Sequence, residues 1–483
     1  MKRTLIIALM FASVILYSGC DLSAPDQPEL NATLGQVVAQ GKFVAVGNSL
    51  TAGFQSSGMV ETAQVNSYPA LIARQLGKQS FQQPLIAEPG IGSTSGMTPL
   101  QLVNGDITAQ PLTVNPLTLL KNATLARPYD NLGVPGATLH DVFNATGAAT
   151  SASGSNLFFD MILRNPNLGN TTQIEQAILL NPSLMILWIG NNDALGAALA
   201  GGNINLLTPT ANFTADYTSV LTKIRTSTHA ALILANIPYV TDIPFVNALD
   251  GVINAGMGVP VISTVADVNG DGVNEVVNVD FNPLPNAELY VPLVTEETGV
   301  AHLTIPALSM YQAGVGVPDS AALVAMGFPS LNASAMVAAM KANGLVPTGQ
   351  PLPGSVTITA SEATTIKTRV DEFNGVIASL AQTFQAPVAD MNAALSVLNA
   401  SGIDGMSGKF VLLDPVHTAF SLDGVHPNDA GYAIVANQFI TVINGALGLQ
   451  VPQVNVSDYA GQYVGKPVAK IALEAAEQVK AIF

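Results

Sequence analysis

Residues 42–53 read Lys-Phe-Val-Ala-Val-Gly-Asn-Ser-Leu-Thr-Ala-Gly, and they are the most informative segment for the fold class. Its first half, 42–46, is a short apolar and β-branched run that is typical of a buried strand and ends at Gly47. Ser49 follows at once. A side chain at the carboxyl end of a parallel strand lies where open α/β sheets bind their ligands. The stretch therefore predicts a sheet that presents Ser49 at its functional edge, although a serine before a helix is also a common N-cap.

Strand and helix patterns alternate along the rest of the chain. Further buried-strand candidates lie at 184–189, 231–235 and 387–389, and amphipathic helical patterns lie at 67–76, 172–180, 211–224 and 362–384. This alternation predicts right-handed crossovers and a parallel sheet that is covered by helices on both faces. We therefore expect residues 41–450 to form a three-layer α/β/α sandwich of the flavodoxin-like kind, and we take the protein to be a monomer.

One long segment breaks this alternation. Residues 238–360 are rich in Gly, Pro, Val and Met, with one short helical pattern at 332–342, and we interpret them as an insertion in the α/β domain. Met336 and Met340 lie one helical turn apart in it. They slightly favour an apolar substrate, but core packing is the simpler interpretation. Residues 451–483 end in an amphipathic pattern that we expect to pack on the domain.

The N-terminus has the pattern of a processed signal. Lys2 and Arg3 precede an apolar run, and Ser18-Gly19-Cys20 ends it. This end resembles the lipobox of bacterial lipoproteins and implies that residues 1–19 are removed and that Cys20 is lipidated. An ordinary secretory signal or an uncleaved anchor would give a similar run. Residues 20–40 then form a polar tether. We expect a membrane lipoprotein of the bacterial cell envelope, in the outer membrane rather than the inner one.

The charge and the cysteine content argue against a nucleic-acid-binding protein and against a disulfide-stabilised one. Loss of Lys2 and Arg3 with the signal takes the formal net charge from −16 to −18, because two positive charges leave. Such a chain would be repelled by phosphate backbones, so nucleic acid is an improbable partner. Cys20 is the single cysteine, and stability must therefore come from an apolar core rather than from disulfides.

Three further segments supply groups that acyl transfer needs, namely a base, an orienter for that base, and donors for an oxyanion. In 131–136 (Asn-Leu-Gly-Val-Pro-Gly), a turn after a short extended stretch, Gly136 can bring a bare N–H close to substrate, although it can equally be an ordinary turn glycine. The strand pattern at 184–189 is followed by Asn192, whose amide can donate to an oxyanion or simply form a turn. Leu-Asp-Gly-Val-His-Pro at 422–427 sets Asp423 three residues before His426.

The Asp-x-x-His spacing occurs twice, since Asp414 and His417 repeat it nine residues earlier. Spacing alone cannot choose between the two pairs. The residues after the second pair, Pro427 and then Asn-Asp-Ala-Gly-Tyr, place it on a loop that enters a helix. This context favours Asp423 and His426.

Taken together, the blocks around Ser49, Gly136, Asn192 and the pair Asp423 and His426 resemble the ordered blocks of the SGNH (GDSL) hydrolase family. The resemblance implies Ser49 as nucleophile, His426 as base and Asp423 as its orienter. It also implies an oxyanion hole made by the backbone N–H groups of Ser49 and Gly136 and by the Asn192 side chain. The chain departs from the family at Asn48, where an aspartate is usual, and in its much greater length.

The resemblance implies a serine hydrolase that cleaves carboxylic esters and needs no cofactor for catalysis. Its partners would be a small ester or lipid substrate and the membrane that holds the anchor. A lipase or long-chain esterase competes with a carbohydrate-ester deacetylase. A catalytically idle surface protein that uses the fold for adhesion or glycan binding is the alternative of another class.

The insertion holds one further motif. Asp267, Asn269, Asp271 and Glu275 stand at the first, third, fifth and ninth positions of a loop with glycine sixth, as in calcium-binding loops. The twelfth position is Asn278, which cannot supply bidentate carboxylate ligation. A β-hairpin with an Asn-Gly-Asp-Gly turn explains the same residues. A structural Ca²⁺ is therefore a hypothesis for this loop.

Overall fold

A five-stranded parallel sheet forms the centre of the molecule. The computed structural model describes residues 37, 38, 40–103, 106–250, 261–266, 275–280, 293–294, 300–325, 327–342, 344–414, 416–463 and 466–467. The strands of the sheet are β1 (Phe43–Gly47), β6 (Asn131–Gly133), β7 (Leu184–Trp188), β8 (Ala231–Ala235) and β13 (Val388–Ala389). Across the sheet they run β13-β8-β7-β1-β6, and every neighbouring pair is parallel. In chain order this is the flavodoxin-like arrangement, which confirms the predicted fold class.

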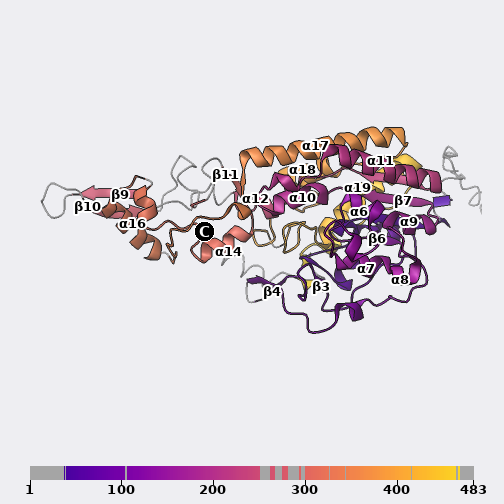
Figure 1. The fold of residues 1–483 in the computed structure, drawn as a ribbon, viewed down its shortest axis with the longest axis horizontal. Coiled ribbons are helices and arrows are strands. Elements are labelled where there is room, and N and C mark those ends of the chain that lie inside the picture. The colour runs from indigo at the N-terminus through magenta and orange to yellow at the C-terminus, as the bar shows by residue number, and fades with distance from the viewer. Residues whose placement is uncertain are drawn as a thin grey trace, which may run out of the picture.

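Helices cover both faces of the sheet (Figure 1). On one face α5 (Tyr68–Gln75) packs against α19 (Asp429–Leu447). The other face carries α6 (Leu139–Asn144), α9 (Gln173–Leu179), α11 (Thr210–Ser227) and α17 (Ala360–Thr383), which contact one another in sequence. The strands and the inner sides of these helices form one continuous apolar core. Burial of both faces explains why β1, β7 and β8 are apolar runs rather than alternating patterns.

Local signals set where these helices begin. Ser67 caps α5, whose first turn contains Pro69. The side chains of Thr172 and Glu175 form a capping box for α9, and Thr359 and Glu362 form one for α17. The predicted helices at 67–76, 172–180, 211–224 and 362–384 are thus confirmed to within a few residues at their ends.

The turn predicted at 131–136 is only partly right. Residues 131–133 form the edge strand β6, which pairs with β1, and the turn begins only at Val134. Three residues are too few to show a strand period in the sequence. The strand is held by side-chain bonds that pattern does not reveal: Asn131 Nδ2 donates to the Thr51 carbonyl at 2.8 Å, and Asn131 Oδ1 accepts from the Gly133 N–H at 3.0 Å.

The insertion extends away from the α/β body (Figure 1). Its described elements are α12 (Pro244–Asn247), β9 (Val261–Ala266), β10 (Glu275–Asp280), β11 (Val300–Leu303), α14 (Pro306–Gln312), α15 (Ser320–Ala325), α16 (Ser330–Ala342) and β12 (Thr357–Thr359). β11 and β12 pair antiparallel and return the chain to α17. Met336 and Met340 are buried in a small cluster with Val317 and Leu323, away from the central sheet, so the core interpretation of these methionines holds.

The smaller elements frame one edge of the sheet or follow its strands. They are α3 (Ser49–Ala52), β2 (Gly58–Met59), α4 (Glu61–Gln64), β3 (Ile91–Gly92), β4 (Gln101–Val103), β5 (Asp106–Thr108), α7 (Leu157–Leu163), α8 (Asn165–Leu168), α10 (Asn192–Leu199), α18 (Met391–Ser401), β14 (Gln462–Tyr463) and β15 (Lys466–Pro467). Of the described helices, α19 alone is long and apolar enough to cross a membrane, and more than half of its most apolar stretch is buried in the core.

Several predicted features lie wholly or partly outside the described residues. The signal at 1–19, Cys20 and most of the tether at 20–40 are among them, although Val38 is already buried in the core. Asp267, Asn269 and Asp271 also lie outside, between β9 and β10, which pair antiparallel; Glu275 begins β10. At the other end, Val451, Val454 and Val456 pack in the core, whereas 468–483 lie outside.

Candidate active site

Ser49 lies where the first strand gives way to a helix. β1 is buried along its length, Asn48 caps α3 by accepting from the Leu50 N–H at 3.0 Å, and Ser49 is the first residue of that helix. Gly47 makes the turn possible, because a Cβ on it would lie 2.1 Å from Thr51 Oγ1 and 2.4 Å from the Trp188 carbonyl oxygen. The serine thus stands at the carboxyl end of β1, next to β7, at the point where the strand order of the sheet reverses.

A chain of hydrogen bonds joins Ser49 to two residues more than 370 positions away. Ser49 Oγ lies 2.9 Å from His426 Nε2, and His426 Nδ1 lies 2.8 Å from Asp423 Oδ2. The Phe54 ring packs against the imidazole with 4.8 Å between centroids. The structure therefore brings together the three residues that the sequence proposes as nucleophile, base and orienter. In this arrangement His426 can accept the serine proton while the carboxylate fixes its tautomer.

Asp423 is buried but kept ionised. Burial by itself raises the pKa of this carboxyl, but the charge of His426 and hydrogen bonds from His426 and Val425 outweigh it and lower the pKa to about 2. The backbone N–H groups of Val425 and His426 each donate to Asp423 Oδ1 at 2.9 Å. The carboxylate thus remains an acceptor for the imidazole at any pH at which His426 can act as a base.

The second Asp-x-x-His pair is a surface feature. His417 Nδ1 lies 3.2 Å from Asp414 Oδ1, so this pair also forms, but the His417 side chain is 61% exposed compared with 12% for His426. A serine is present here too, because Ser407 Oγ donates to Asp414 Oδ2 at 2.8 Å. That serine bonds to the acid and not to the base. The order of contacts therefore differs from the order at Ser49, as the sequence context predicts.

The three groups that the sequence predicts as oxyanion donors lie along one cleft. Gly136 has a φ of +79°, a conformation that favours glycine, and its N–H and that of Ser49 donate to no other group among the described residues. Asn192 follows β7 and uses one amide hydrogen to donate to the Ala137 carbonyl at 2.8 Å. This bond ties the amide to the Gly136 turn and leaves its second hydrogen free. All three predicted donors line the same cleft as His426.

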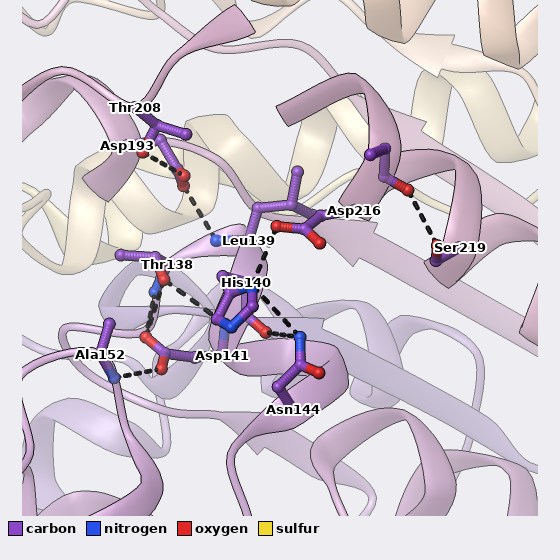
Figure 2. A network of polar contacts seen from close by, with 11 residues as sticks. Thr138, Leu139, His140, Asp141, Asn144, Ala152, Asp193, Thr208, Asp216 and Ser219 are labelled. Carbon is purple, nitrogen blue, oxygen red and sulfur yellow. Dashed lines mark hydrogen bonds and ion pairs between the residues drawn. The ribbon is translucent and has the colours of Figure 1, made fainter. Parts of the chain in front are cut away.

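A buried carboxylate joins the two donor segments. Asp193 Oδ2 accepts from the Leu139 N–H at 2.9 Å, at the first turn of α6, and Oδ1 accepts from Thr208 Oγ1 at 2.9 Å (Figure 2). Burial raises the pKa of Asp193 to about 6, although both hydrogen bonds lower it. Because α6 begins directly after the Gly136 turn, Asp193 fixes this turn relative to Asn192.

The same network continues to the surface of the domain. Asp141 closes a capping box on Thr138 and accepts from the Ala152 N–H, while His140 Nδ1 lies 3.1 Å from Asp216 Oδ2 on α11 (Figure 2). Helix α6, which holds the Gly136 turn in place, is thereby tied to its neighbours at both its first turn and its outer side.

Two clefts meet at Ser49 and His426. One, the apolar cleft, has a volume of about 120 Å³ and runs between α10, α18 and α19. Its walls include Trp188, Leu195, Tyr239, Ala394, Leu395, Leu398, Phe420, Ile434 and Val435. The other, the wide cleft, has a volume of about 740 Å³ and is lined by Phe54, Gly136, Phe158, Phe245 and five serines (Ser57, Ser93, Ser95, Ser153 and Ser155). The two clefts offer separate places for the two halves of an ester.

Some residues of the site escape sequence reasoning. The Ser57 N–H donates to Asp423 Oδ2 at 2.6 Å, and Ser421 Oγ donates to Asp423 Oδ1 at 3.1 Å. Neither serine belongs to a block that signals function, and Ser57 acts through its backbone, which any residue supplies. Asp193 does stand beside Asn192 in the sequence, but its partners on α6 become visible only in the fold.

Comparison with known proteins agrees with this geometry. The profile of the family described as GDSL-like lipase/acylhydrolase matches residues 43–281 and 309–439. Two solved structures are similar at 12% identity and a TM-score of 0.31: a lipase/acylhydrolase from Enterococcus faecalis, with 86% of this chain and 99% of that one covered, and the acetyl xylan esterase AlAXEase, with 83% and 99% covered. At this distance neither informs on the substrate. The search of curated proteins found no match. Because the family profile spans most of the chain and includes all five predicted site residues, the chain belongs to the GDSL-like lipase/acylhydrolase family.

Proposed function

We propose that the protein hydrolyses carboxylic esters through an acyl-enzyme on Ser49. The observation that carries this proposal is the unbroken contact series from Ser49 Oγ to His426 Nε2 at 2.9 Å and from His426 Nδ1 to Asp423 at 2.8 Å. His426 Nε2 takes the hydroxyl proton as Ser49 Oγ bonds to the ester carbonyl carbon. The oxyanion that forms accepts hydrogen bonds from the Ser49 and Gly136 N–H groups and from Asn192 Nδ2.

The protonated His426 then completes the first half of the reaction. It gives its proton to the alcohol oxygen, the bond from the carbonyl carbon to that oxygen breaks, and the alcohol leaves. A water molecule next loses a proton to His426 Nε2 and attacks the acyl-enzyme. When this second tetrahedral intermediate collapses, the proton returns to Ser49 Oγ and the carboxylic acid is released.

The apolar cleft supports an ester with a short apolar acyl group. An apolar protein cavity of roughly 150 Å³ holds benzene, so a cleft of about 120 Å³ has room for an acyl chain of about four to six carbons. Its walls are aliphatic and aromatic, and a charged acyl group would lose its hydration there without gaining a partner. We therefore infer an esterase that prefers butanoyl and hexanoyl esters to acetyl and palmitoyl esters.

A series of p-nitrophenyl esters from acetate to palmitate tests this preference, with kcat/KM as the measurement. Ala394 on α18 lines the apolar cleft, so Ala394→Phe should shift the optimum toward acetate. Ala393, the preceding residue on the same helix, is exposed and does not line either cleft, so Ala393→Phe is the matched control. If the two variants show the same dependence of kcat/KM on chain length, the acyl chain does not bind in the apolar cleft.

A carbohydrate-ester deacetylase is the second candidate. The five serines along the wide cleft favour it, because their hydroxyls can bond to a polyhydroxylated alcohol. Turnover of acetylated sugars above that of p-nitrophenyl butanoate would select this candidate.

Anchoring through Cys20 completes the proposal. The Ser18-Gly19-Cys20 motif supports lipidation of Cys20 and a place on the outer membrane of a bacterial cell envelope, with the enzyme held near ester substrates outside the cytoplasm.

A further inference from the structure

The Asp423 carboxylate has two donors that come from outside its own turn with His426. The Ser57 N–H donates to Oδ2 at 2.6 Å, the same oxygen that faces His426 Nδ1. Ser421 Oγ donates to Oδ1 at 3.1 Å. Ser421 is fully buried and lines neither cleft, so it has no route to the substrate.

Ser421 is itself held by the segment that follows the nucleophile. The Ser56 N–H donates to Ser421 Oγ at 2.9 Å, and Ser56 Oγ accepts from the Leu422 N–H at 3.3 Å. A directed series therefore runs from the Ser56 N–H through the Ser421 hydroxyl to the carboxylate. Each donor in such a series polarises the next, which strengthens the last bond to the charged oxygen.

The backbone of this segment is strained in a way that serves these contacts. Ser56 and Ser57 have φ values of 52° and 57°, two consecutive non-glycine residues in the left-handed region. Such residues persist only where surrounding contacts hold them. Here the conformation directs the Ser56 N–H to Ser421 Oγ and the Ser57 N–H to Asp423 Oδ2.

A second contact fixes the segment to the helix that follows His426. Gln55 Nε2 donates to Asp429 Oδ1 at 2.6 Å, and Asn66 Nδ2 donates to Asp429 Oδ2 at 2.9 Å. Asp429 is the first residue of α19 and is buried. Residues 55–57 thus connect the segment that follows Ser49 to residues on both sides of His426, namely Ser421 and Asp423 before it and Asp429 after it.

We propose that Ser421, held by the Ser56–Ser57 turn, is a positioning residue for the reaction, and that it acts on catalysis only through Asp423. This inference rests on the proposed function of Ser49, His426 and Asp423. Ser421 holds Asp423 Oδ1 and thereby keeps Oδ2 in line with His426 Nδ1. Without it the carboxylate retains its backbone donors but can rotate away from the imidazole.

A double-mutant cycle on the full-length protein tests this, with p-nitrophenyl butanoate as substrate. Ser421→Ala should lower kcat about tenfold, as expected for loss of one hydrogen bond to a charged group, and leave KM within about twofold. In the Asp423→Ala background the same replacement should change kcat by less than about twofold, because its effect has no remaining route. A purely structural role for Ser421 would lower activity in both backgrounds.

Ser407 supplies the matched control. It donates to Asp414 in the surface Asp-x-x-His pair, so Ser407→Ala removes the same kind of bond without touching the site and should leave kcat unchanged. Ser421→Ala cannot be used if it lacks a cooperative unfolding transition, because it is then not natively folded. In that case Ser421→Cys fills the same space with a weak donor, and its effect on kcat must likewise disappear in the Asp423→Ala background.

Three results would overturn the inference: an unchanged kcat in Ser421→Ala, an equal loss in both Asp423 backgrounds, or an equal loss in Ser407→Ala. A failure of the proposed function is recognised separately, because then Asp423→Ala alone would leave kcat unchanged.

Discussion

At the level of single residues, the two Asp-x-x-His pairs share one spacing but differ in what the histidine contacts. Asp414 with His417 and Asp423 with His426 both bring a carboxylate to imidazole Nδ1, at 3.2 and 2.8 Å. Only His426 has its other nitrogen on a serine hydroxyl. A base must reach the nucleophile as well as its orienter, so the pair at the surface lacks the second contact that acyl transfer requires.

Activity of histidine variants tests this assignment. His426→Ala should reduce kcat nearly as much as Ser49→Ala, because nucleophile and base act as a unit and their losses do not add. Asp423→Ala should reduce it less, since an orienter is not itself a proton acceptor. His417→Ala is the control and should keep most of its activity. An inactive His417→Ala beside an active His426→Ala would move the base to the earlier pair.

Most residues of this candidate site are predictable because they lie next to elements that the sequence reveals. Ser49 and Asn192 come after apolar strand runs, and His426 comes just before Asn428, which caps α19. Ser421 and Ser57 were not predictable, since one is a buried serine without a motif and the other contributes only a backbone N–H. Their importance depends on contacts across more than 360 residues of sequence.

At the scale of elements, the long helices and buried strands follow from their periodicity, whereas the edge strand does not. β6 has three residues and contains Asn131 and Gly133, so its place in the sheet depends on side-chain bonds to α3 rather than on an apolar run. The junction of α6 with α10 is similar. It depends on the burial of Asp193, which no local pattern indicates.

The Asp193 carboxyl predicts a pH dependence of stability. Its pKa is raised by burial from 3.8 to about 6, so the folded state binds the proton more tightly than the unfolded chain does. The stabilisation is complete below about pH 3.8 and is lost as the pH rises through about 6. Asp429 is raised by burial in the same direction and to about the same value.

We therefore expect Asp193→Asn to lose less stability than the natural protein between pH 5 and pH 7.5. The loss of unfolding free energy between the two pH values should be smaller in the variant by about 1 kcal/mol, as measured by urea unfolding at each pH. The asparagine can still accept from the Leu139 N–H and donate to Thr208, so the fold should persist. Parallel stability curves for the two proteins would show that Asp193 is ionised throughout this range.

In the whole molecule, the two ends of the insertion pack in the core of the α/β body, through Val240, Ile243, Val246 and Ile358, whereas its middle has clusters of its own. One of these clusters contains Met336 and Met340, and another contains Leu303 and Leu352. The insertion touches the active site at its root, where the Phe245 N–H donates to the Gly424 carbonyl at 2.8 Å, between Asp423 and His426. The sequence does not reveal this contact, because no pattern links Phe245 to Gly424, which lies 179 residues further along the chain.

Calcium binding by the loop of the insertion remains a prediction from the sequence. Because a ligand that binds only the folded state stabilises it, millimolar Ca²⁺ should raise the Tm of EDTA-treated protein. Asp271→Ala should abolish the shift. An unchanged Tm in the natural protein would leave Asp267, Asn269, Asp271 and Glu275 as residues of a β-hairpin.

Lipidation is tested by metabolic labelling of cells that express the full chain. Cys20→Ser should remove incorporation of radiolabelled fatty acid and slow the processing of residues 1–19, because Cys20 is the single thiol in the chain. Continued incorporation into the variant would show that the lipobox interpretation is wrong.

Covalent labelling tests whether Ser49 is a nucleophile that His426 activates. A fluorophosphonate probe should modify Ser49, as located by peptide mass spectrometry of the full-length protein. Labelling should disappear in Ser49→Ala, become much slower in His426→Ala, and remain normal in His417→Ala. Absence of labelling in the natural protein, or a label on another serine such as Ser407, would show that Ser49 is not the nucleophile.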